Sequence, residues 1–310
     1  MNVLITGASG FLGGHLVQTL RGQKQFSLYA LDRHYYEFAH CSVANYLLYG
    51  EMQKSPSEFS SEIVDGLTRN GIQAVDAIVH SAAMSSFSGC EDQPEAAERA
   101  NVHFTEAISR VAKHYGAYLI YISTDLVFDG CPAAPQGGFS ETDVPNPSSV
   151  YAQTKLRGER FVEELSVNGV VLRVSLLYGG PAGRNGGPLH WIVSAVSSNS
   201  KVKAFVDEWR TPLYVLDLVT IIERCLDMKP FGLFHCAGSE RVSRPEFMKV
   251  IFQSLGADEA LIEGCSRLEA SGPRRPEDVS LCAQRLQGEL GFSPTPLSQG
   301  ISLSLRGFHR

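Results

Sequence analysis

The sequence lacks the features by which several classes of protein are recognised. It has no run of Lys and Arg, and its net charge is −6 with a pI near 5.9, so the basic surface needed for nucleic-acid binding is missing. No apolar run approaches the ~20 residues that cross a bilayer. The N-terminus begins with an apolar strand rather than the charged segment and cleavage site of a signal peptide. We therefore expect partners that are neither nucleic acids nor membranes.

Paired cysteines are also lacking. The seven cysteines are widely scattered and form no C-x-x-C pair, which is typical of reduced thiols in a cytoplasmic protein. The histidines do not show the spacing of metal ligands, so no metal site is predicted. Hydrophobic residues make up 44% of the 310 residues and charged residues 19%, which is usual for a globular protein with a sizeable core.

Short apolar runs alternate with amphipathic stretches in the first 174 residues. The expected strands are Asn2–Thr6, Phe26–Leu31, Tyr46–Gly50, Val75–His80, Tyr118–Ser123 and Val170–Val174. The expected helices are Phe11–Leu20, Ser57–Thr68, Pro94–Tyr115 and Tyr151–Leu165. This alternation, with strands rich in Val, Ile and Leu, predicts an α/β protein with a Rossmann-type doubly wound parallel sheet covered on both faces.

The pattern changes after about residue 175, where the Gly-rich stretch 179–187 predicts a long loop. Later elements are expected as helices at Leu189–Ser197, Leu213–Leu226 and Arg244–Leu255 and a strand at Gly232–Cys236, with residues 264–280 irregular. These predict a smaller C-terminal α/β lobe that binds the substrate. We assign residues 1–174 to the Rossmann domain, with 213–232 returning to it, and 175–212 and 233–310 to the lobe.

A glycine-rich loop joins the first expected strand to the first expected helix. Gly7, Gly10 and Gly13 in "ITGASGFLGGHL" are spaced G-x-x-G-x-x-G, which permits a tight turn and sets the helix N-terminus against a pyrophosphate. A dinucleotide cofactor, NAD(P), is therefore predicted. Asp32, at the end of the second strand, favours NAD because a carboxylate accepts from the ribose 2′-hydroxyl. Arg33 favours NADP because a guanidinium pairs with a 2′-phosphate, so the residues leave the choice open.

Acid–base chemistry is indicated by two segments further along. Tyr151 and Lys155 lie four residues apart, and therefore on one face of their expected helix. A free tyrosine has a pKa of about 10, and a neighbouring ammonium group favours its phenolate. The stretch "YISTDLVFDG" turns from an apolar strand to Ser123, Thr124 and Asp125, at the carboxyl end of a strand where open α/β sheets bind ligands.

The glycine-rich loop comes first, then the strand ending in Ser-Thr-Asp, then the Tyr-x-x-x-Lys pair. With these three segments in this order, the chain resembles the extended short-chain dehydrogenase/reductase family, and within it the dTDP-4-dehydrorhamnose reductase-like branch. The segments that carry the resemblance are "TGASGFLGGHL", "DAIVHSAAMSS", "YISTDLVFDG", "NPSSVYAQTKLRGE", "DEWRTPLYVLDL" and "RRPEDVSLC". Together they span nearly the whole chain. It implies an NAD(P)-dependent oxidoreductase that reduces or oxidises a keto or hydroxyl group of a nucleotide-activated sugar.

The resemblance also implies roles for single residues. Thr124 would bind the reacting oxygen, Tyr151 would exchange the proton, and Lys155 would bind the nicotinamide ribose and tune Tyr151. The cofactor contacts expected in all are Gly7, Gly10, Phe11, Leu12, Gly13, Asp32, Arg33, Glu51, Met52, Ser81, Ala82, Ala83, Tyr151 and Lys155. The expected substrate contacts are Ser85, Thr124, Asp125 and Arg210.

Arginines in the C-terminal part are candidates for binding an anionic substrate. They are Arg210 in "DEWRTP" and the pair Arg274 and Arg275 in "PRRPED". A guanidinium group binds a diphosphate through two parallel hydrogen bonds. A solvated or interdomain salt bridge is the alternative for each of them.

The residue after Thr124 and Asp125 narrows the range of reactions that we expect. Family members that dehydrate sugars resemble Thr-Asp-Glu here, whereas this chain has Leu126, which cannot transfer a proton. Rhamnose reductases usually have an aromatic residue at this position and a Trp where this chain has Leu176, so a substrate of different shape is expected. The substrate and the direction of hydride transfer stay open, and a homodimer is one assembly compatible with the sequence.

Two alternatives to a reductase use the same residues. An epimerase of nucleotide sugars needs the same Thr124, Tyr151 and Lys155 together with tightly held NAD. The β subunit of methionine adenosyltransferase, which acts on a partner enzyme, is similar to the same branch. A non-catalytic NAD(P)-binding regulatory subunit is therefore the second alternative.

Overall fold

A computed structural model describes residues 1–33, 45–48, 54–131, 133–164, 168–183, 187–270 and 275–309, with only the backbone described at 45–48 and 309. The strands are β1 (Asn2–Thr6), β2 (Ser27–Asp32), β3 (Asn45–Leu48), β4 (Ala77–His80), β5 (Tyr118–Thr124), β6 (Gly169–Val174), β7 (Leu177–Tyr178), β8 (Val202–Phe205), β9 (Trp209–Arg210), β10 (Leu213–Tyr214), β11 (Gly232–Cys236), β12 (Val242–Ser243) and β13 (Ile262–Cys265). The α-helices are α1 (Phe11–Leu20), α2 (Pro56–Arg69), α3 (Phe87–Asp92), α4 (Pro94–Glu98), α5 (Phe104–Tyr115), α6 (Val150–Glu164), α7 (His190–Ser197), α8 (Val215–Met228), α9 (Arg244–Leu255), α10 (Gln284–Leu290) and α11 (Leu297–Leu305).

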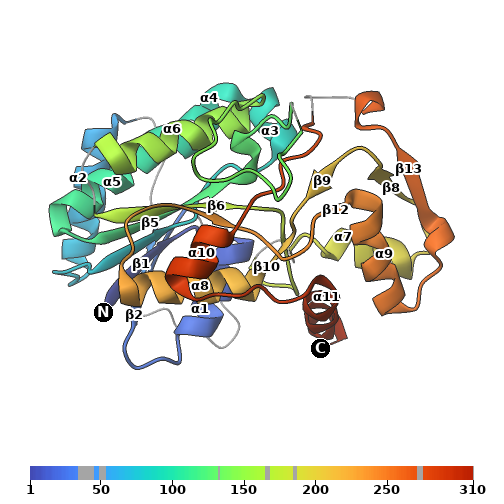
Figure 1. The fold of residues 1–310 in the computed structure, drawn as a ribbon. Helices are drawn as coiled ribbons and strands as arrows, with labels where there is room; N and C mark the ends of the chain where they lie inside the picture. Colours follow the sequence, from blue (N-terminus) through green and yellow to red (C-terminus); the bar gives the residue numbers. More distant parts are fainter. Residues whose placement is uncertain are drawn as a thin grey trace. The chain divides into compact units, whose positions relative to one another are not determined.

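One sheet carries the order β11-β6-β5-β4-β1-β2-β3. The pairs β1–β2, β1–β4, β2–β3 and β4–β5 are parallel. Every residue of β4 and of β6 is buried, as expected for strands covered on both faces. Figure 1 shows α2, α5 and α6 on one face of the sheet and α1 on the other. The Rossmann-type α/β fold expected from the sequence is confirmed.

The core beneath α2 and α5 explains why these segments are helical. Buried Phe59, Ile63 and Leu67 of α2 are spaced four residues apart and pack with Phe104 and Ile108 of α5 in one hydrophobic cluster. Such spacing gives a helix one apolar face. The start of α2 is fixed by a capping box, in which Ser55 and Glu58 each bond the other's backbone N–H. The helix expected at Ser57–Thr68 is therefore one residue longer at each end.

The single helix expected over Pro94–Tyr115 is interrupted. The segment Arg99–His103 is a π-helical turn between α4 and α5. At its centre, the Asn101 side chain is turned inward and bonds the backbone of Met84, and the Thr105 hydroxyl donates to the Asn101 carbonyl oxygen at 2.7 Å. Side-chain contacts thus hold the π turn, and single π turns of this kind occur inside α-helices.

Smaller differences occur in the last third of the chain. The helix expected from Leu213 begins at Val215, because Leu213 and Tyr214 pair with β7 as β10. In the stretch expected to be irregular, residues 264 and 265 end strand β13, which is paired in parallel with β8. These strands of two to four residues are too short for an alternating pattern to be visible in the sequence.

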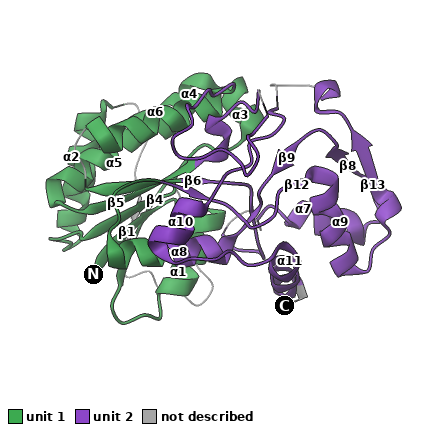
Figure 2. Cartoon of the chain, viewed as in Figure 1, with its two compact units in different colours: residues 1–123, 149–172, 222–233 green, residues 124–148, 173–221, 234–310 purple. Residues whose placement is uncertain are grey.

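The chain divides into two compact units (Figure 2). Unit 1 comprises residues 1–123, 149–172 and 222–233, and unit 2 comprises 124–148, 173–221 and 234–310. In unit 2, α9 contacts α11 and the β8–β13 pair. The domain boundaries expected from the sequence at 174, 212 and 232 stay a prediction. None of the described helices combines the length and hydrophobicity needed to cross a membrane.

We predict opposite effects of alanine at two glycines. A Cβ at Gly13 would collide with the Gly7 carbonyl oxygen and lie 2.6 Å from Ala8 Cα, whereas a Cβ at Gly66 in α2 meets nothing within 4 Å. Gly13→Ala should lower the free energy of unfolding by about 1–3 kcal/mol through overpacking. Gly66→Ala should raise it by about 0.5–1 kcal/mol, because alanine loses less backbone entropy in a helix. Urea denaturation of both variants measures this, and a shift of the same sign in both would contradict it.

Candidate active site

The glycine loop is held close to the end of β4. Gly7 has a φ of +69°, which favours glycine, and a Cβ there would lie 2.7 Å from Ala82 Cα. The Gly7 N–H donates to the Leu31 carbonyl at 3.1 Å, and the Gly10 N–H donates to the Gly7 carbonyl at 2.9 Å. The loop predicted to bind the cofactor thus packs directly on a residue predicted to line its nicotinamide side.

The N-terminus of α1 meets the requirements for holding a phosphate. Its N-cap is Gly10, no side chain caps it, and its first turn contains no acidic residue. The backbone N–H groups of the first turn carry the positive end of the helix dipole. Phe11, Leu12 and Gly13 form this turn. The described residues therefore fit the pyrophosphate of a dinucleotide.

Asp32 ties the end of β2 to the same loop. Its buried carboxylate accepts the N–H of Ser9 at 2.9 Å and the N–H of Arg33 at 2.7 Å. A carboxylate has room for further donors, so a ribose hydroxyl can still be bound. The Arg33 side chain is exposed. Glu51 and Met52, predicted to contact adenine, lie outside the described residues.

The stretch after β4 is anchored to β1 through one threonine. Thr6 accepts a hydrogen bond from the Ser81 hydroxyl at its carbonyl, at 2.7 Å, and from the Ala82 N–H at its hydroxyl, at 3.2 Å. The Thr6 hydroxyl also bonds the buried ring of His80 at 2.7 Å. Burial lowers the pKa of His80 well below its usual range, which keeps this ring neutral and structural. Ala83, the residue after Ala82, is half-buried, and Ser85 is exposed.

Asn101 was missed by the sequence reasoning. It is fully buried in the π turn, accepts the Met84 N–H at 2.8 Å, and donates to the Met84 carbonyl at 3.1 Å and the Thr154 hydroxyl at 3.0 Å. It thereby links the stretch after β4 to α6, next to Lys155. A signal was present, because Asn101 stands on the apolar stripe that also contains Ala97, Phe104 and Ile108.

Lys155 is buried among groups that decide its protonation. Its Nζ lies over the ring of Tyr121, 4.1 Å from the centroid, and its side chain is buried. Burial lowers the pKa of Lys155 to about 7, against the opposing charge of Glu159 one turn later. Glu159 accepts the Ser123 hydroxyl at 2.5 Å. Tyr151 is half-buried one turn before Lys155 on α6, so the helix carries both predicted catalytic groups on one face.

The hydroxyl end of Tyr121 lies against α6. Its hydroxyl donates to the Lys155 carbonyl at 3.1 Å, and it occupies the space where a side chain at position 158 would stand, since a Cβ on Gly158 would collide with the Tyr121 hydroxyl. The helix can approach the strand this closely because residue 158 is glycine. The aromatic ring of Tyr121 is thereby held beneath the Lys155 ammonium group.

Thr124 and Asp125 belong to unit 2, where their side chains are engaged with each other. The Thr124 hydroxyl donates to Asp125 Oδ1 at 3.1 Å and accepts the Leu126 N–H at 3.2 Å. Asp125 Oδ2 accepts the Ser175 hydroxyl at 3.3 Å and is 3.4 Å from Arg210 Nη1. Burial raises the pKa of Asp125, and the Arg210 guanidinium opposes this. For Thr124 to bind a substrate oxygen as a donor, its hydroxyl proton must turn away from Asp125.

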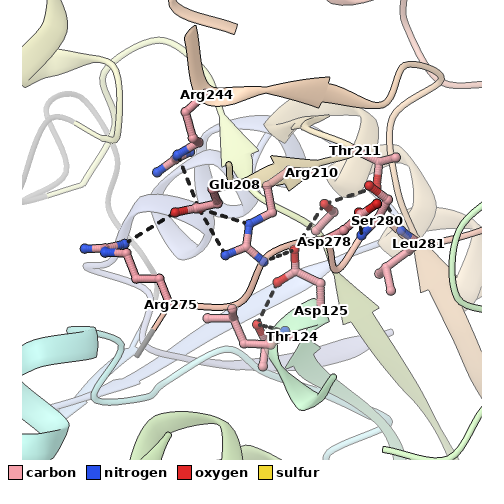
Figure 3. A network of polar contacts seen from close by, with 12 residues as sticks. Thr124, Asp125, Glu208, Arg210, Thr211, Arg244, Arg275, Asp278, Ser280 and Leu281 are labelled. Atoms are coloured by element: carbon pink, nitrogen blue, oxygen red, sulfur yellow. Dashed lines mark hydrogen bonds and ion pairs between the residues drawn. The ribbon is translucent and has the colours of Figure 1, made fainter. Parts of the chain in front are cut away.

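Arg210 reaches a second buried carboxylate, that of Glu208 (Figure 3). Glu208 Oε1 accepts Arg210 Nη2 at 3.2 Å and Nε at 3.3 Å, and lies 3.3 Å from Arg244 Nε. Its Oε2 is 3.9 Å from Arg275 Nη1 without a hydrogen bond. Burial acts to raise the pKa of Glu208, but the three guanidinium groups hold it below its usual range. Arg274 lies outside the described residues.

Glu208 and Arg244 were not singled out from the sequence. Glu208 stands two residues before Arg210, and Arg244 follows the N-cap of α9. A lone glutamate beside an arginine is common on protein surfaces, so the sequence carried no sign that this one is buried.

The family model of the RmlD substrate binding domain matches residues 1–309 of the chain. The chain belongs to this family. The expected similarity to the dTDP-4-dehydrorhamnose reductase-like branch of the extended short-chain dehydrogenase/reductase family is thereby confirmed.

Among similar proteins outside the solved structures, a probable low-salt glycan biosynthesis reductase of Haloferax volcanii is 28% identical over 305 residues, 97% of this chain and 96% of its own. The β subunit of methionine adenosyltransferase 2 from Bos taurus is 33% identical over 239 residues, 74% of this chain and 70% of its own. The RmlD family relationship thus extends to a protein named as a reductase and to one named as a subunit.

Two solved structures share the fold of this RmlD-family chain. The crystal structure of a dTDP-4-dehydrorhamnose reductase from Clostridium acetobutylicum has a TM-score of 0.84 at 24% identity, with 100% of each chain covered. That of a dTDP-4-dehydrorhamnose reductase from Bacillus anthracis, in complex with NADP, has a TM-score of 0.82 at 23% identity, with 98% of each chain covered.

We predict that Lys155 makes stability depend on pH. Its pKa is about 7 in the folded protein and about 10.4 in an unfolded chain. Between these values the unfolded state binds more protons, so the free energy of unfolding contributed by Lys155 rises with pH and is lowest below pH 7. Urea denaturation of cofactor-free protein from pH 6 to about 9.5 should show this rise, and Lys155→Met should flatten it.

Lys113→Met is the matched control, because Lys113 is exposed on α5. This variant should keep the pH dependence of the unmodified protein. Parallel curves for Lys155→Met and the unmodified protein would contradict the prediction.

Proposed function

We propose that the protein is an NAD(P)-dependent oxidoreductase that reduces or oxidises a keto or hydroxyl group of a nucleotide-activated sugar, in the manner of a 4-keto-sugar reductase. The observation that carries the proposal is the pair Tyr151 and Lys155 one turn apart on α6, with Lys155 buried over Tyr121 and its pKa lowered to about 7. The family relationship to proteins named as reductases supports it.

The proposed cofactor site is built from the glycine loop. Gly7, Gly10 and the first turn of α1 would hold the pyrophosphate, and Asp32 the adenosine ribose, with Arg33 beside it. Ser81, Ala82 and Ala83 would line the nicotinamide side. NAD(P)H, when bound, supplies the hydride. Asp32 favours NAD and Arg33 favours NADP, so activity should be assayed with both NADH and NADPH.

The proton would be handled by the chain itself. The Tyr151 hydroxyl would give its proton to the substrate oxygen, and Lys155 would stabilise the phenolate that remains. A lysine with a pKa near 7 can itself release and regain a proton at neutral pH, so Lys155 would also pass a proton back to Tyr151. Thr124 would donate a hydrogen bond to the reacting oxygen once its hydroxyl has turned from Asp125.

Leucines at two positions shape the proposed substrate preference. Leu126 and Leu176 are half-buried. Leu126 cannot transfer a proton, so the reaction would be a carbonyl–alcohol conversion rather than a dehydration, and the two leucines in place of aromatic residues would favour a sugar of different shape from that of the rhamnose reductases. Ser85, Asp125 and Arg210 are the other proposed substrate contacts. An epimerase would return its NAD unchanged, and stoichiometric consumption of added NADH or NADPH with substrate would exclude it.

A regulatory subunit is the second candidate function. The observation favouring it is the 33% identity to the Bos taurus methionine adenosyltransferase subunit, against 28% to the Haloferax volcanii reductase. Such a protein would bind NAD(P) and a partner enzyme without turnover. Binding to a methionine adenosyltransferase catalytic subunit, combined with no oxidation of NADH or NADPH on any nucleotide-linked 4-keto-sugar, would favour this function.

We predict that Tyr151→Phe lowers kcat about 10²–10⁴-fold, the range of general acid–base catalysis, while coenzyme binding is kept. The measurement is the loss of NADH or NADPH absorbance with a panel of nucleotide-linked 4-keto-sugars, together with coenzyme binding by fluorescence. Tyr115→Phe is the control, because Tyr115 lies at the end of α5 outside the proposed site. Full turnover by Tyr151→Phe would overturn the proposed chemistry.

A further inference from the structure

The helix that carries Tyr151 begins against a carboxylate from another helix of unit 1. The first residue of α6 is Val150, and its N–H donates to Glu91 Oε1 at 2.7 Å. Glu91 is half-buried and lies near the end of α3, 59 residues earlier in the chain. Tyr151 follows Val150 directly. The contact with α3 is therefore made at the backbone beside the predicted acid–base residue.

The first turn of a helix depends on such contacts more than its middle does. The first four N–H groups of a helix have no partner within it, and helix ends fray. In α6, the Ser149 hydroxyl accepts one N–H of the first turn at 3.2 Å, and Glu91 accepts that of Val150. Lys155 lies one turn further on and is buried over an aromatic ring. Loss of the Glu91 contact would therefore loosen the turn that holds Tyr151 and leave Lys155 in place.

A carboxylate suits the position that Glu91 occupies. The N–H groups at a helix N-terminus carry partial positive charge, so a negative side chain there is favourable. The first turn of α6 contains no acidic residue of its own, and Glu91 supplies the charge from α3. A hydrogen bond to a carboxylate is shorter and stronger than one between neutral groups, which agrees with the 2.7 Å between Val150 N and Glu91 Oε1.

Helix α3 is itself tied to the stretch predicted to line the nicotinamide side. The Cys90 thiol donates to the Met84 carbonyl at 3.2 Å, and the Ser86 side chain caps the start of α3. Met84 comes directly after the predicted nicotinamide contacts at 81–83. Because Glu91 is the neighbour of Cys90, the start of α6 is held to the same segment that would hold the nicotinamide.

We propose that Glu91 is a positioning residue for Tyr151. By holding the Val150 N–H, it fixes the place of the Tyr151 hydroxyl relative to a substrate bound beside the nicotinamide. Glu91 acts through the backbone and exchanges no proton, so the length of its side chain matters more than its charge. This inference rests on the proposed function, because it takes Tyr151 to be the group that gives its proton to the substrate.

Three substitutions at position 91 test this role. Glu91→Ala and Glu91→Asp lose the contact, since aspartate is one methylene shorter. Each should lower kcat about 10- to 100-fold, because a small misplacement of a catalytic group costs up to this much, and should keep the KM for NADH or NADPH. Glu91→Gln should keep kcat within about threefold, because its amide oxygen accepts the same N–H. The assay follows NADH or NADPH absorbance with nucleotide-linked 4-keto-sugars.

Glu98→Ala is the matched control. The Glu98 carboxylate of α4 accepts Arg157 Nη1 of α6 at 2.7 Å. The same substitution there removes a contact of the same length from the same helix, six residues beyond Tyr151. Glu98→Ala should keep kcat, and urea denaturation shows whether it and Glu91→Ala are folded. An equal fall of kcat in the two variants would show a merely structural role for Glu91 and contradict the inference.

Hydrogen exchange at the start of α6 needs no turnover. The amides of residues 150–153 should exchange faster in Glu91→Ala than in the unmodified protein, and at the unmodified rate in Glu91→Gln and Glu98→Ala. Unchanged exchange in Glu91→Ala would refute the contact on which the inference depends and leave the proposed function standing.

The kinetic outcomes also separate this inference from the proposed function. If the unmodified protein and Glu91→Ala turn over equally well, the inference is wrong and the proposed function stands. If Glu91→Gln is as impaired as Glu91→Ala while Glu91→Asp is active, charge rather than reach matters and the inference is wrong. If the unmodified protein oxidises neither coenzyme with any of the sugars, the proposed function and the inference fall together. If Glu91→Ala does not fold, the comparison of Glu91→Asp with Glu91→Gln still decides.

Discussion

The close contact of Gly7 with Ala82 is the constraint on which the candidate site of unit 1 depends. It requires a residue without a side chain directly after β1, because a Cβ at Gly7 would collide with the backbone of Ala82 after β4. Thr6, one residue earlier, holds Ser81 and Ala82 through its own carbonyl and hydroxyl groups. The loop that would bind the pyrophosphate and the stretch that would line the nicotinamide are therefore positioned by one pair of neighbouring parallel strands, with no long side chain between them.

Buried charge is treated differently in the two units. Lys155 in unit 1 is surrounded by an aromatic ring and a single carboxylate, and its pKa falls to about 7. In unit 2 the buried charges are paired with one another, and burial raises the pKa of Asp125 while arginines hold the pKa of Glu208 below its usual range. A buried ion is costly unless it is paired or can shed its charge. The first solution suits a group that exchanges protons, and the second suits groups that hold a fixed position.

Elements with a long hydrophobic pattern could be predicted from the sequence. Features that depend on one buried contact between distant residues could not. The parallel sheet followed from six apolar runs separated by amphipathic helices, and α1 and α9 were predicted with their observed bounds. The π turn could not be predicted, because it depends on Asn101 meeting Met84, which is distant along the chain. Glu208 was missed for the same reason, since its burial depends on arginines brought from α9 and from residue 275.

Tyr121 and Gly158 have a consequence for how this chain can diverge. The ring fills the space that a side chain at position 158 would need, and the same ring lies beneath Lys155. A larger residue at position 158 therefore requires a shift or a substitution of Tyr121, and either change alters the surroundings of Lys155. Substitutions at the two positions are therefore coupled to each other and to the environment of the lysine. The residues allowed at positions 121 and 158 are therefore limited by the surroundings that Lys155 needs.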